Sequence, residues 1–151
     1  MNARDIMSTH LRTVAPDLSI RDLANFFMEE NVSGAPVTDE SGAFLGIVTE
    51  EDLIFQDKKI QVPTFVNFFA SLIPLGVTQM EAEIKKVAGT RVAEVMQTDP
   101  VTVTPQTLLD EIATLMTDGH AHYLPVLDQG RLVGIITKRD VIRAVARGSI
   151  W

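Results

Sequence analysis

A long internal repeat is the feature that most restricts what this chain can fold into. Residues 5–54 line up with residues 94–142, at an offset of 89 that becomes 88 after a turn that is one residue shorter. The positions that hold identical residues in this register include Met7 and Met96, Val14 and Val103, Pro16 and Pro105, Pro36 and Pro125, and Asp39 and Asp128. Self-similarity over a stretch of this length predicts one supersecondary unit that occurs twice.

Each copy predicts the same order of elements. A short extended piece precedes a proline, because the residue before proline avoids the helical region. Apolar residues at helical spacing then predict a helix, and Ser19 is placed as the N-cap of the first of them. The predicted buried positions of the two helices are Ile20, Leu23, Ala24 and Phe27 in the first copy, and Leu109, Ile112, Ala113 and Met116 in the second.

Two strands and a second helix complete each copy. The strands are predicted at 35–39 and 44–49, and again at 124–128 and 132–137, each pair joined by a turn with glycine. The apolar face of the last helix is predicted to be Val141, Ile142, Val145 and Ala146. One β-α-β-β-α unit of about 50 residues buries little core by itself. We therefore predict an α+β fold in which two such units pack with pseudo-twofold symmetry.

Composition excludes several classes of function. The chain of 151 residues is 46% apolar and 22% charged, which is typical of a globular protein, and it has no cysteine for disulfides, zinc–thiolate sites or thiol catalysis. Its net charge of −7 argues against nucleic-acid binding. No catalytic motif is present, which predicts a non-enzyme. The first ten residues contain no apolar run typical of a signal peptide, so we expect a cytoplasmic protein.

One phrase occurs in both copies with its charges reversed. "GIVTEED" contains Glu50 and Glu51 where "GIITKRD" contains Lys138 and Arg139. Thr followed three residues later by an acid, at a helix start, resembles a capping box, so both phrases have a purely structural interpretation. In the second copy, however, two cations would lie in the first helical turn, where the helix dipole disfavours each by about 0.3–1 kcal/mol.

A bound anion would reverse that penalty. A strand that leads into a helix N-terminus offers free backbone N–H groups, and an arginine fork suits phosphate. The sequence thus favours the hypothesis that the first phrase caps a helix and the second holds a phosphorylated ligand. The capping interpretation stays open for both.

The repeated unit resembles the cystathionine-β-synthase (CBS) domain. The resemblance rests on the Val-x-Pro entry, on the strands "GAPV" and "YLPV", and on the ending Gly-apolar-apolar-Thr-x-x-Asp, all in order and all twice, over 3–56 and 91–148. A tandem pair of this kind is called a Bateman module. We predict a first repeat at 1–56, a helical insert or linker at 57–90, and a second repeat at 91–151.

The resemblance implies a nucleotide site between the two repeats. In such pairs the Asp of the ending holds ribose hydroxyls, and the Thr and its neighbours approach the phosphate. The main cleft implied in this way comprises Met7, Thr9, Val32, Ser33, Gly34, His122, Ile135, Thr137, Arg139 and Asp140. A second cleft, weaker because its helix start is acidic, comprises Ile47, Thr49, Asp52, Met96, Thr98 and Tyr123.

These implications lead to a functional hypothesis. We expect a non-enzymatic regulatory module that binds AMP, ADP or ATP and signals through a change of conformation or assembly. The resemblance also implies a homodimer, and an effector protein that the sequence does not identify. Two alternatives remain: an interaction module with an empty cleft that docks a partner through the insert, and a module that binds S-adenosylmethionine.

Two further features leave alternatives open. Residues 60–80 carry no charge, but their prolines and polar residues argue against a membrane span. They could pack on the repeats, associate with a membrane, or form a dimer or partner surface through Phe65, Phe68, Phe69 and Leu72. His120 and His122 precede a strand and could ligate a metal, although no third ligand is evident and we predict no metal site. A phosphate-side role for His122, or an ordinary loop position, are the other possibilities.

Overall fold

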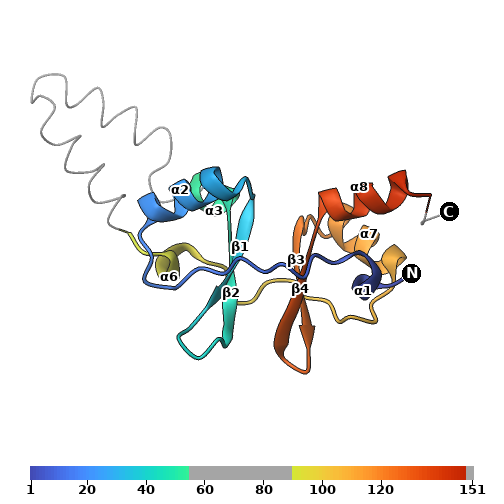
Figure 1. Ribbon diagram of the computed structural model, residues 1–151, viewed down its shortest axis with the longest axis horizontal. Helices are drawn as coiled ribbons and strands as arrows, with labels where there is room; N and C mark the ends of the chain where they lie inside the picture. Colours follow the sequence, from blue (N-terminus) through green and yellow to red (C-terminus); the bar gives the residue numbers. More distant parts are fainter. Residues whose placement is uncertain (55–89, 149–151) are drawn as a thin grey trace, which may run out of the picture. The chain divides into compact units, whose positions relative to one another are not determined.

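The computed structural model describes residues 1–54 and 90–148 (Figure 1). These form two compact units, each described by itself below. Unit 1 contains residues 1–13, 36–47 and the described residues from 97 onward, and unit 2 contains residues 14–35 together with the described residues of 48–96. Almost all of the predicted insert 57–90, including Phe65, Phe68, Phe69 and Leu72, lies outside the described residues.

Each repeat combines helices with one pair of neighbouring strands, which confirms the predicted α+β class. In the first repeat the elements are α1 (Ala3–Ile6), α2 (Ile20–Glu30), β1 (Gly34–Thr38), β2 (Phe44–Thr49) and α3 (Glu50–Ile54). In the second repeat they are α6 (Val92–Val95), α7 (Leu109–Thr117), β3 (Tyr123–Asp128), β4 (Arg131–Thr137) and α8 (Lys138–Ala146). The strands form two separate two-stranded sheets, β1–β2 and β3–β4.

The beginning of each repeat differs from the prediction. The expected first strand of the second copy is reduced to a single parallel bridge between Val103 and Val126. A four-residue helix that was not predicted precedes it in the chain, α6, and α1 is its counterpart in the first repeat. Such a short helix has no apolar periodicity, so the pattern that reveals the longer helices is absent.

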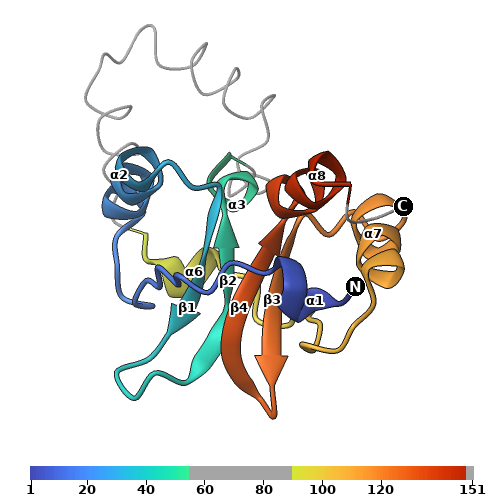
Figure 2. The ribbon, with the colours of Figure 1, turned by 45° about the vertical axis from the view of Figure 1, so that its right-hand side comes forward.

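In unit 1 the chain's first residues pack on the second repeat. The N–H groups of Ala3 and Arg4 donate to the carbonyls of Thr107 (2.8 Å) and Pro105 (3.0 Å). Leu109 N–H in turn donates to the carbonyl of Met1 at 3.1 Å. Both views therefore draw α1 beside the β3–β4 hairpin and α7, although about a hundred residues separate them in sequence (Figures 1 and 2).

Unit 2 repeats these contacts with the roles of the two copies exchanged. Val92 N–H donates to the carbonyl of Leu18, and Ala93 N–H to that of Pro16, both at 2.9 Å. Ile20 N–H donates to the carbonyl of Thr90 at the same distance. The entry segment of each repeat, α1 or α6, thus packs on the other repeat. The compact units therefore interleave the repeats, and the boundaries 1–56, 57–90 and 91–151 stay predictions.

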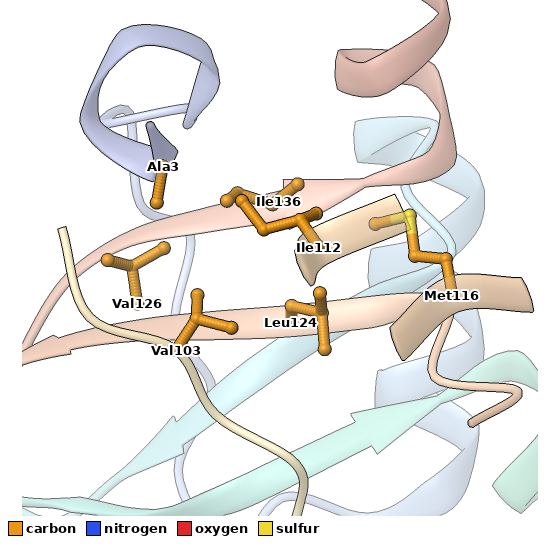
Figure 3. Packing of buried hydrophobic residues seen from close by; sticks show 7 residues of the cluster. All are labelled: Ala3, Val103, Ile112, Met116, Leu124, Val126 and Ile136. Atoms are coloured by element: carbon orange, nitrogen blue, oxygen red, sulfur yellow. The ribbon is translucent and has the colours of Figure 1, made fainter. Parts of the chain in front are cut away.

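The core of unit 1 combines these elements (Figure 3). Its buried residues come from α1, α7, the two strands and the bridge segment: Ala3, Val103, Ile112, Met116, Leu124, Val126 and Ile136. The helical spacing predicted for both long helices is confirmed at the larger residues, which are buried: Leu109, Ile112 and Met116 on α7, and Ile20, Leu23 and Phe27 on α2. The other two predicted positions, Ala24 and Ala113, are only half-buried. Ser19 caps α2 as predicted, since its hydroxyl accepts from Asp22 N–H at 3.2 Å.

The predicted apolar face of α8 is mostly exposed. Ile142 is 64% exposed and Val145 43% exposed, whereas the buried residues of this helix are Asp140 and Ala144. Residues four apart lie on one side of a helix, so the buried side runs through Asp140 and Ala144, with Val141 partly buried beside the core. Periodicity located a stripe on α8, but the stripe faces outward.

Two glycines at equivalent positions let the entry segments approach the strands. Ser8 pairs with Ile135 of β4 through two backbone hydrogen bonds, and Gln97 pairs with Ile47 of β2 in the same way. A Cβ on the preceding residue of β2, Gly46, would overlap the carbonyl oxygen of Gln97. A Cβ on the equivalent residue of β4, Gly134, would instead meet the side chain of Met7, including its Cγ at 2.8 Å.

We predict that Gly46→Ala destabilises the chain more than Gly134→Ala. At Gly46 the obstacle is the backbone oxygen of Gln97, a residue held to Ile47 by two hydrogen bonds, so overpacking should lower the free energy of unfolding by about 1–3 kcal/mol. At Gly134 the obstacle is a flexible side chain that can move. Urea unfolding measures both costs.

A double variant tests the cause. Met7→Ala should remove most of the cost of Gly134→Ala, because the two substitutions then share one contact. It should leave the cost of Gly46→Ala unchanged. Additive costs for Met7→Ala and Gly134→Ala would contradict the proposed contact.

Candidate functional site

The site begins where β4 ends and α8 starts. Thr137 N–H donates to Oδ2 of Asp140 at 2.8 Å, and the Thr137 hydroxyl donates to the same oxygen at 3.2 Å. In the first copy Thr49 makes the same two bonds to Asp52, at 2.8 and 3.1 Å. Both phrases therefore close a helix start, as the capping interpretation predicted for each of them. The hypothesis that the second phrase also holds a phosphorylated ligand does not depend on these bonds.

The charge reversal lies on exposed positions of the first helical turns. Lys138 and Arg139 are both exposed at the start of α8, and neither has a hydrogen-bond or ion-pair partner among the described residues. Glu50 and Glu51 are exposed at the start of α3. Because the positive end of the helix dipole lies here, the acids are favourable and the two cations are not. Within the described part of the chain, the positive charge of these two side chains therefore has no ion-pair partner.

Asp140 is a buried carboxylate with a second partner that sequence reasoning missed. Arg143 Nη1 lies 3.1 Å from Asp140 Oδ1, and the side chains are 48% and 5% exposed respectively. A buried carboxylate requires such compensation, because burying its charge without a partner costs on the order of several kcal/mol. The spacing of three residues on a helix is the feature of the sequence from which this pair could have been inferred.

Tyr123 lies close enough to Asp140 to be affected by its charge. Burial of the phenol, and secondly the negative charge of Asp140, raise the pKa of Tyr123 well above its usual range. Tyr123 begins β3 and pairs in register with Thr137. The sequence assigned Tyr123 to the second cleft, which stays a prediction, but its electrostatic environment in unit 1 is that of Asp140.

The two histidines before β3 differ in their surroundings. His122 Nδ1 is buried and has no hydrogen-bond partner among the described residues. His120 is exposed and lies in the left-handed region (φ 53°) before the strand begins. Both residues precede β3, so they do not share one face of a strand, which is the arrangement that the metal interpretation used. The described residues contain no group of three or more His, Cys, Asp or Glu that could hold a metal ion.

The entry segment brings further predicted residues to β4. Ser8 pairs with Ile135, and Met7 packs over Gly134, so Met7 and Ile135 lie in adjacent paired segments of unit 1. Seven residues of the predicted main cleft belong to this unit: Met7, Thr9, His122, Ile135, Thr137, Arg139 and Asp140. The other three, Val32, Ser33 and Gly34, belong to unit 2, where the carbonyl of Ser33 accepts from Glu50 N–H.

The residues predicted for the second cleft are likewise divided. Ile47, Thr98 and Tyr123 belong to unit 1, whereas Thr49, Asp52 and Met96 belong to unit 2. Within its own unit, Thr49 is held to Asp52 by the hydrogen bonds already described. Membership of both clefts stays a prediction.

Comparison with known proteins decides the family. The CBS domain family matches the chain twice, at residues 3–58 and 92–147. The chain belongs to the CBS domain family. The resemblance inferred from the repeated motifs is thereby confirmed, as is the reading of the chain as two CBS repeats in tandem.

Relatives from plants and archaea resemble this CBS pair over most of its length. The chloroplastic CBS domain-containing protein CBSX2 of Arabidopsis thaliana is 31% identical over 141 residues, which are 89% of this chain and 58% of that protein. The crystal structure of CBSX2 in complex with AMP has a TM-score of 0.72 and 28% identity, covering 97% of this chain and 96% of that chain. The protein MJ1426 of Methanocaldococcus jannaschii is 27% identical over 154 residues, covering 96% and 91% of the two chains.

The described helices also bear on the membrane alternative. None of the helices in residues 1–54 and 90–148 is long and apolar enough to cross a membrane. The uncharged stretch 60–80, from which that alternative arose, lies outside the described residues.

We predict that Tyr123, the only tyrosine of the chain, titrates abnormally. Because its folded-state pKa is raised, the neutral phenol is favoured by folding. This contribution to stability is fully present below about pH 10, the pKa of an unfolded tyrosine, and is lost as the pH rises further. Near-ultraviolet absorbance should detect no tyrosinate in the folded CBS pair at pH values where a free tyrosine ionises.

Two variants separate the causes of this shift. Asp140→Asn should lower the pKa of Tyr123 only in part, because burial is the larger cause and remains. Tyr123→Phe should make the loss of unfolding free energy above about pH 10 less steep than in the wild type. Tyrosinate absorbance that appears at an ordinary pH in the folded chain would show that Tyr123 is not buried in solution.

Proposed function

We propose that this CBS pair is a non-enzymatic regulatory module that binds an adenosine nucleotide at the Asp140 end of unit 1. In this proposal the Asp140 carboxylate accepts hydrogen bonds from the ribose hydroxyls. Arg139 and the N-terminus of α8 hold the phosphate, and Met7 and Ile135 contact the base. The output is a change of conformation or assembly.

The observation that carries the proposal is the uncompensated charge at the start of α8. Lys138 and Arg139 are exposed in its first turn and have no partner in the described part of the chain. A phosphate placed there would interact favourably with both cations and with the dipole of α8. The same position in the first copy carries Glu50 and Glu51 and would repel it.

Two further observations support the same site. His122 Nδ1 is buried without a partner among the described residues, so it has an unused hydrogen-bonding capacity next to β3. The relative CBSX2, 28% identical to this chain, has been crystallised in complex with AMP. AMP is therefore the first ligand to test, ahead of ADP, ATP and S-adenosylmethionine.

We predict that AMP raises the melting temperature of the wild-type chain and that Asp140→Ala abolishes this effect. A ligand present at 100 times its dissociation constant stabilises the folded state by about 2.7 kcal/mol. For a chain of this length that corresponds to a shift of several degrees. Differential scanning fluorimetry with AMP, ADP, ATP and S-adenosylmethionine measures the effect and ranks the ligands.

A structural interaction module is the second candidate, and one observation favours it. Thr137 and Asp140 make the same helix-closing bonds as Thr49 and Asp52, so the motif has a sufficient structural role without any ligand. Arg139→Glu, which copies the first repeat, separates the two functions. It should abolish AMP binding if Arg139 holds phosphate. If the motif only starts a helix, it should be neutral or slightly stabilising.

The homodimer implied by the family resemblance is part of the proposal. Ile142 and Val145, three residues apart on α8, are 64% and 43% exposed, and an exposed apolar helix face often marks a contact surface. We propose that a second copy of the chain covers it. The effector protein, and any role of Phe65, Phe68, Phe69 and Leu72 in docking it, stay predictions.

We predict that Ile142→Glu converts a dimer into a monomer in sedimentation velocity experiments. The reason is that a charge on this face would have to be buried in the dimer. Met28→Glu, at a position on α2 that is 82% exposed, is the matched control and should leave the dimer intact. A wild-type chain that sediments as a monomer at high concentration would contradict this part of the proposal.

A further inference from the structure

Both oxygens of Asp140 are occupied in the ligand-free chain. Oδ2 accepts from the backbone and the hydroxyl of Thr137, and Oδ1 accepts from Nη1 of Arg143 at 3.1 Å. The bonds to Oδ2 belong to the helix start and recur in the first copy. The bond to Oδ1 is of a different kind, because it comes from a side chain on the solvent side of α8.

Arg143 is able to leave this position at low cost. Its side chain is 48% exposed, whereas that of Asp140 is 5% exposed. A long side chain that is already half in water can rotate its guanidinium fully into solvent. Asp140 cannot follow, because Thr137 holds its other oxygen. The carboxylate then needs a new donor, since a buried charge without a partner is strongly disfavoured.

We propose that Arg143 is an internal competitor that sets the affinity of the Asp140 site for ligands with a vicinal diol. This inference rests on the proposed function, in which ribose hydroxyls donate to Asp140. In the free chain Arg143 satisfies Oδ1. A bound ribose supplies hydroxyl donors to the same oxygen and displaces the guanidinium. The favourable binding free energy that the diol contributes is then the free energy of its interaction with Asp140, reduced by that of the ion pair that it replaces.

An arginine three residues after the Asp of the repeated phrase occurs in the second copy only. The residue three positions after Asp52 in the sequence is Phe55, which has no charge with which to form such a pair. The second copy therefore combines three features: cations in the first turn, a deeply buried carboxylate, and a displaceable guanidinium on that carboxylate. A ligand that binds there must offer both an anion and hydroxyl donors, as a ribonucleotide does.

The test compares two probes that differ only in the diol. AMP and 2′,3′-dideoxy-AMP share the base and the phosphate, so a general effect of removing a positive charge cancels in the ratio of their affinities. The variant is Arg143→Met, which keeps the length of the aliphatic stem. Arg147→Met is the matched control, because it removes the same charge one turn further along the chain, just after α8. Calorimetric titration gives each dissociation constant.

We expect Arg143→Met to raise the preference for AMP, measured as the dissociation constant of 2′,3′-dideoxy-AMP divided by that of AMP, by about two- to fivefold. This range corresponds to the strength of an ion pair in which one partner, Arg143, is half-exposed. Arg147→Met should leave that preference unchanged. AMP binding that appears only in Arg143→Met would support the proposal most strongly. An unchanged preference overturns it, and a reduced preference would mean that Arg143 orients Asp140 for the ligand.

A ligand-free measurement separates this inference from the proposed function. Urea unfolding of Asp140→Asn, Arg143→Met and the double variant gives the coupling between the two side chains. A coupling of zero overturns the inference whatever the chain binds. If the coupling is present but neither the wild type nor any variant binds AMP, the proposed function fails, and the role of Arg143 as a competitor fails with it.

Discussion

The exchange of entry segments between the two repeats is the interaction on which the rest of the structure depends. A four-residue helix such as α1 is too short to be stable in isolation, and its first N–H groups have no acceptor within the helix. The carbonyls of Pro105 and Thr107 provide those acceptors, and α6 obtains them from Pro16 and Leu18 in the same way. Because Ala3 is fully buried in the core of unit 1, the second repeat cannot complete its core without residues from the first.

The same exchange assembles the candidate site. The hydrogen bonds between Ser8 and Ile135 align the chain's first residues with β4, two residues before that strand reaches Thr137. Met7 can lie flat against the strand only because Gly134 has no side chain. A packing solution that satisfies the backbone of α1 therefore also places residues from both ends of the sequence around one helix start.

The repeat, the long helices and the hairpins were predictable, because their evidence is local or periodic. Ile112 and Met116 are buried as their spacing indicates, and the family follows from motifs that occur twice in order. The entry helices were not predictable, since α1 and α6 are stabilised by carbonyls distant in sequence. The outward face of α8 was missed for a related reason: hydropathy identifies an apolar stripe but not what covers it. Neither the burial of Asp140 nor its pairing with Arg143 has a hydropathy pattern, although the helical spacing of the pair is visible in the sequence.

The geometry of the two helix starts also shows that helix capping does not account for their opposite charges. Thr49 with Asp52 and Thr137 with Asp140 close their helices with nearly identical bonds, so the fold does not require different residues between them. In the first copy the intervening acids, Glu50 and Glu51, interact favourably with the helix dipole. In the second copy Lys138 and Arg139 oppose it, at about 0.3–1 kcal/mol each. This charge pattern, which the fold neither needs nor benefits from, is the observation on which the proposed anion site at α8 rests, because a bound anion would make the unfavourable interaction a favourable one.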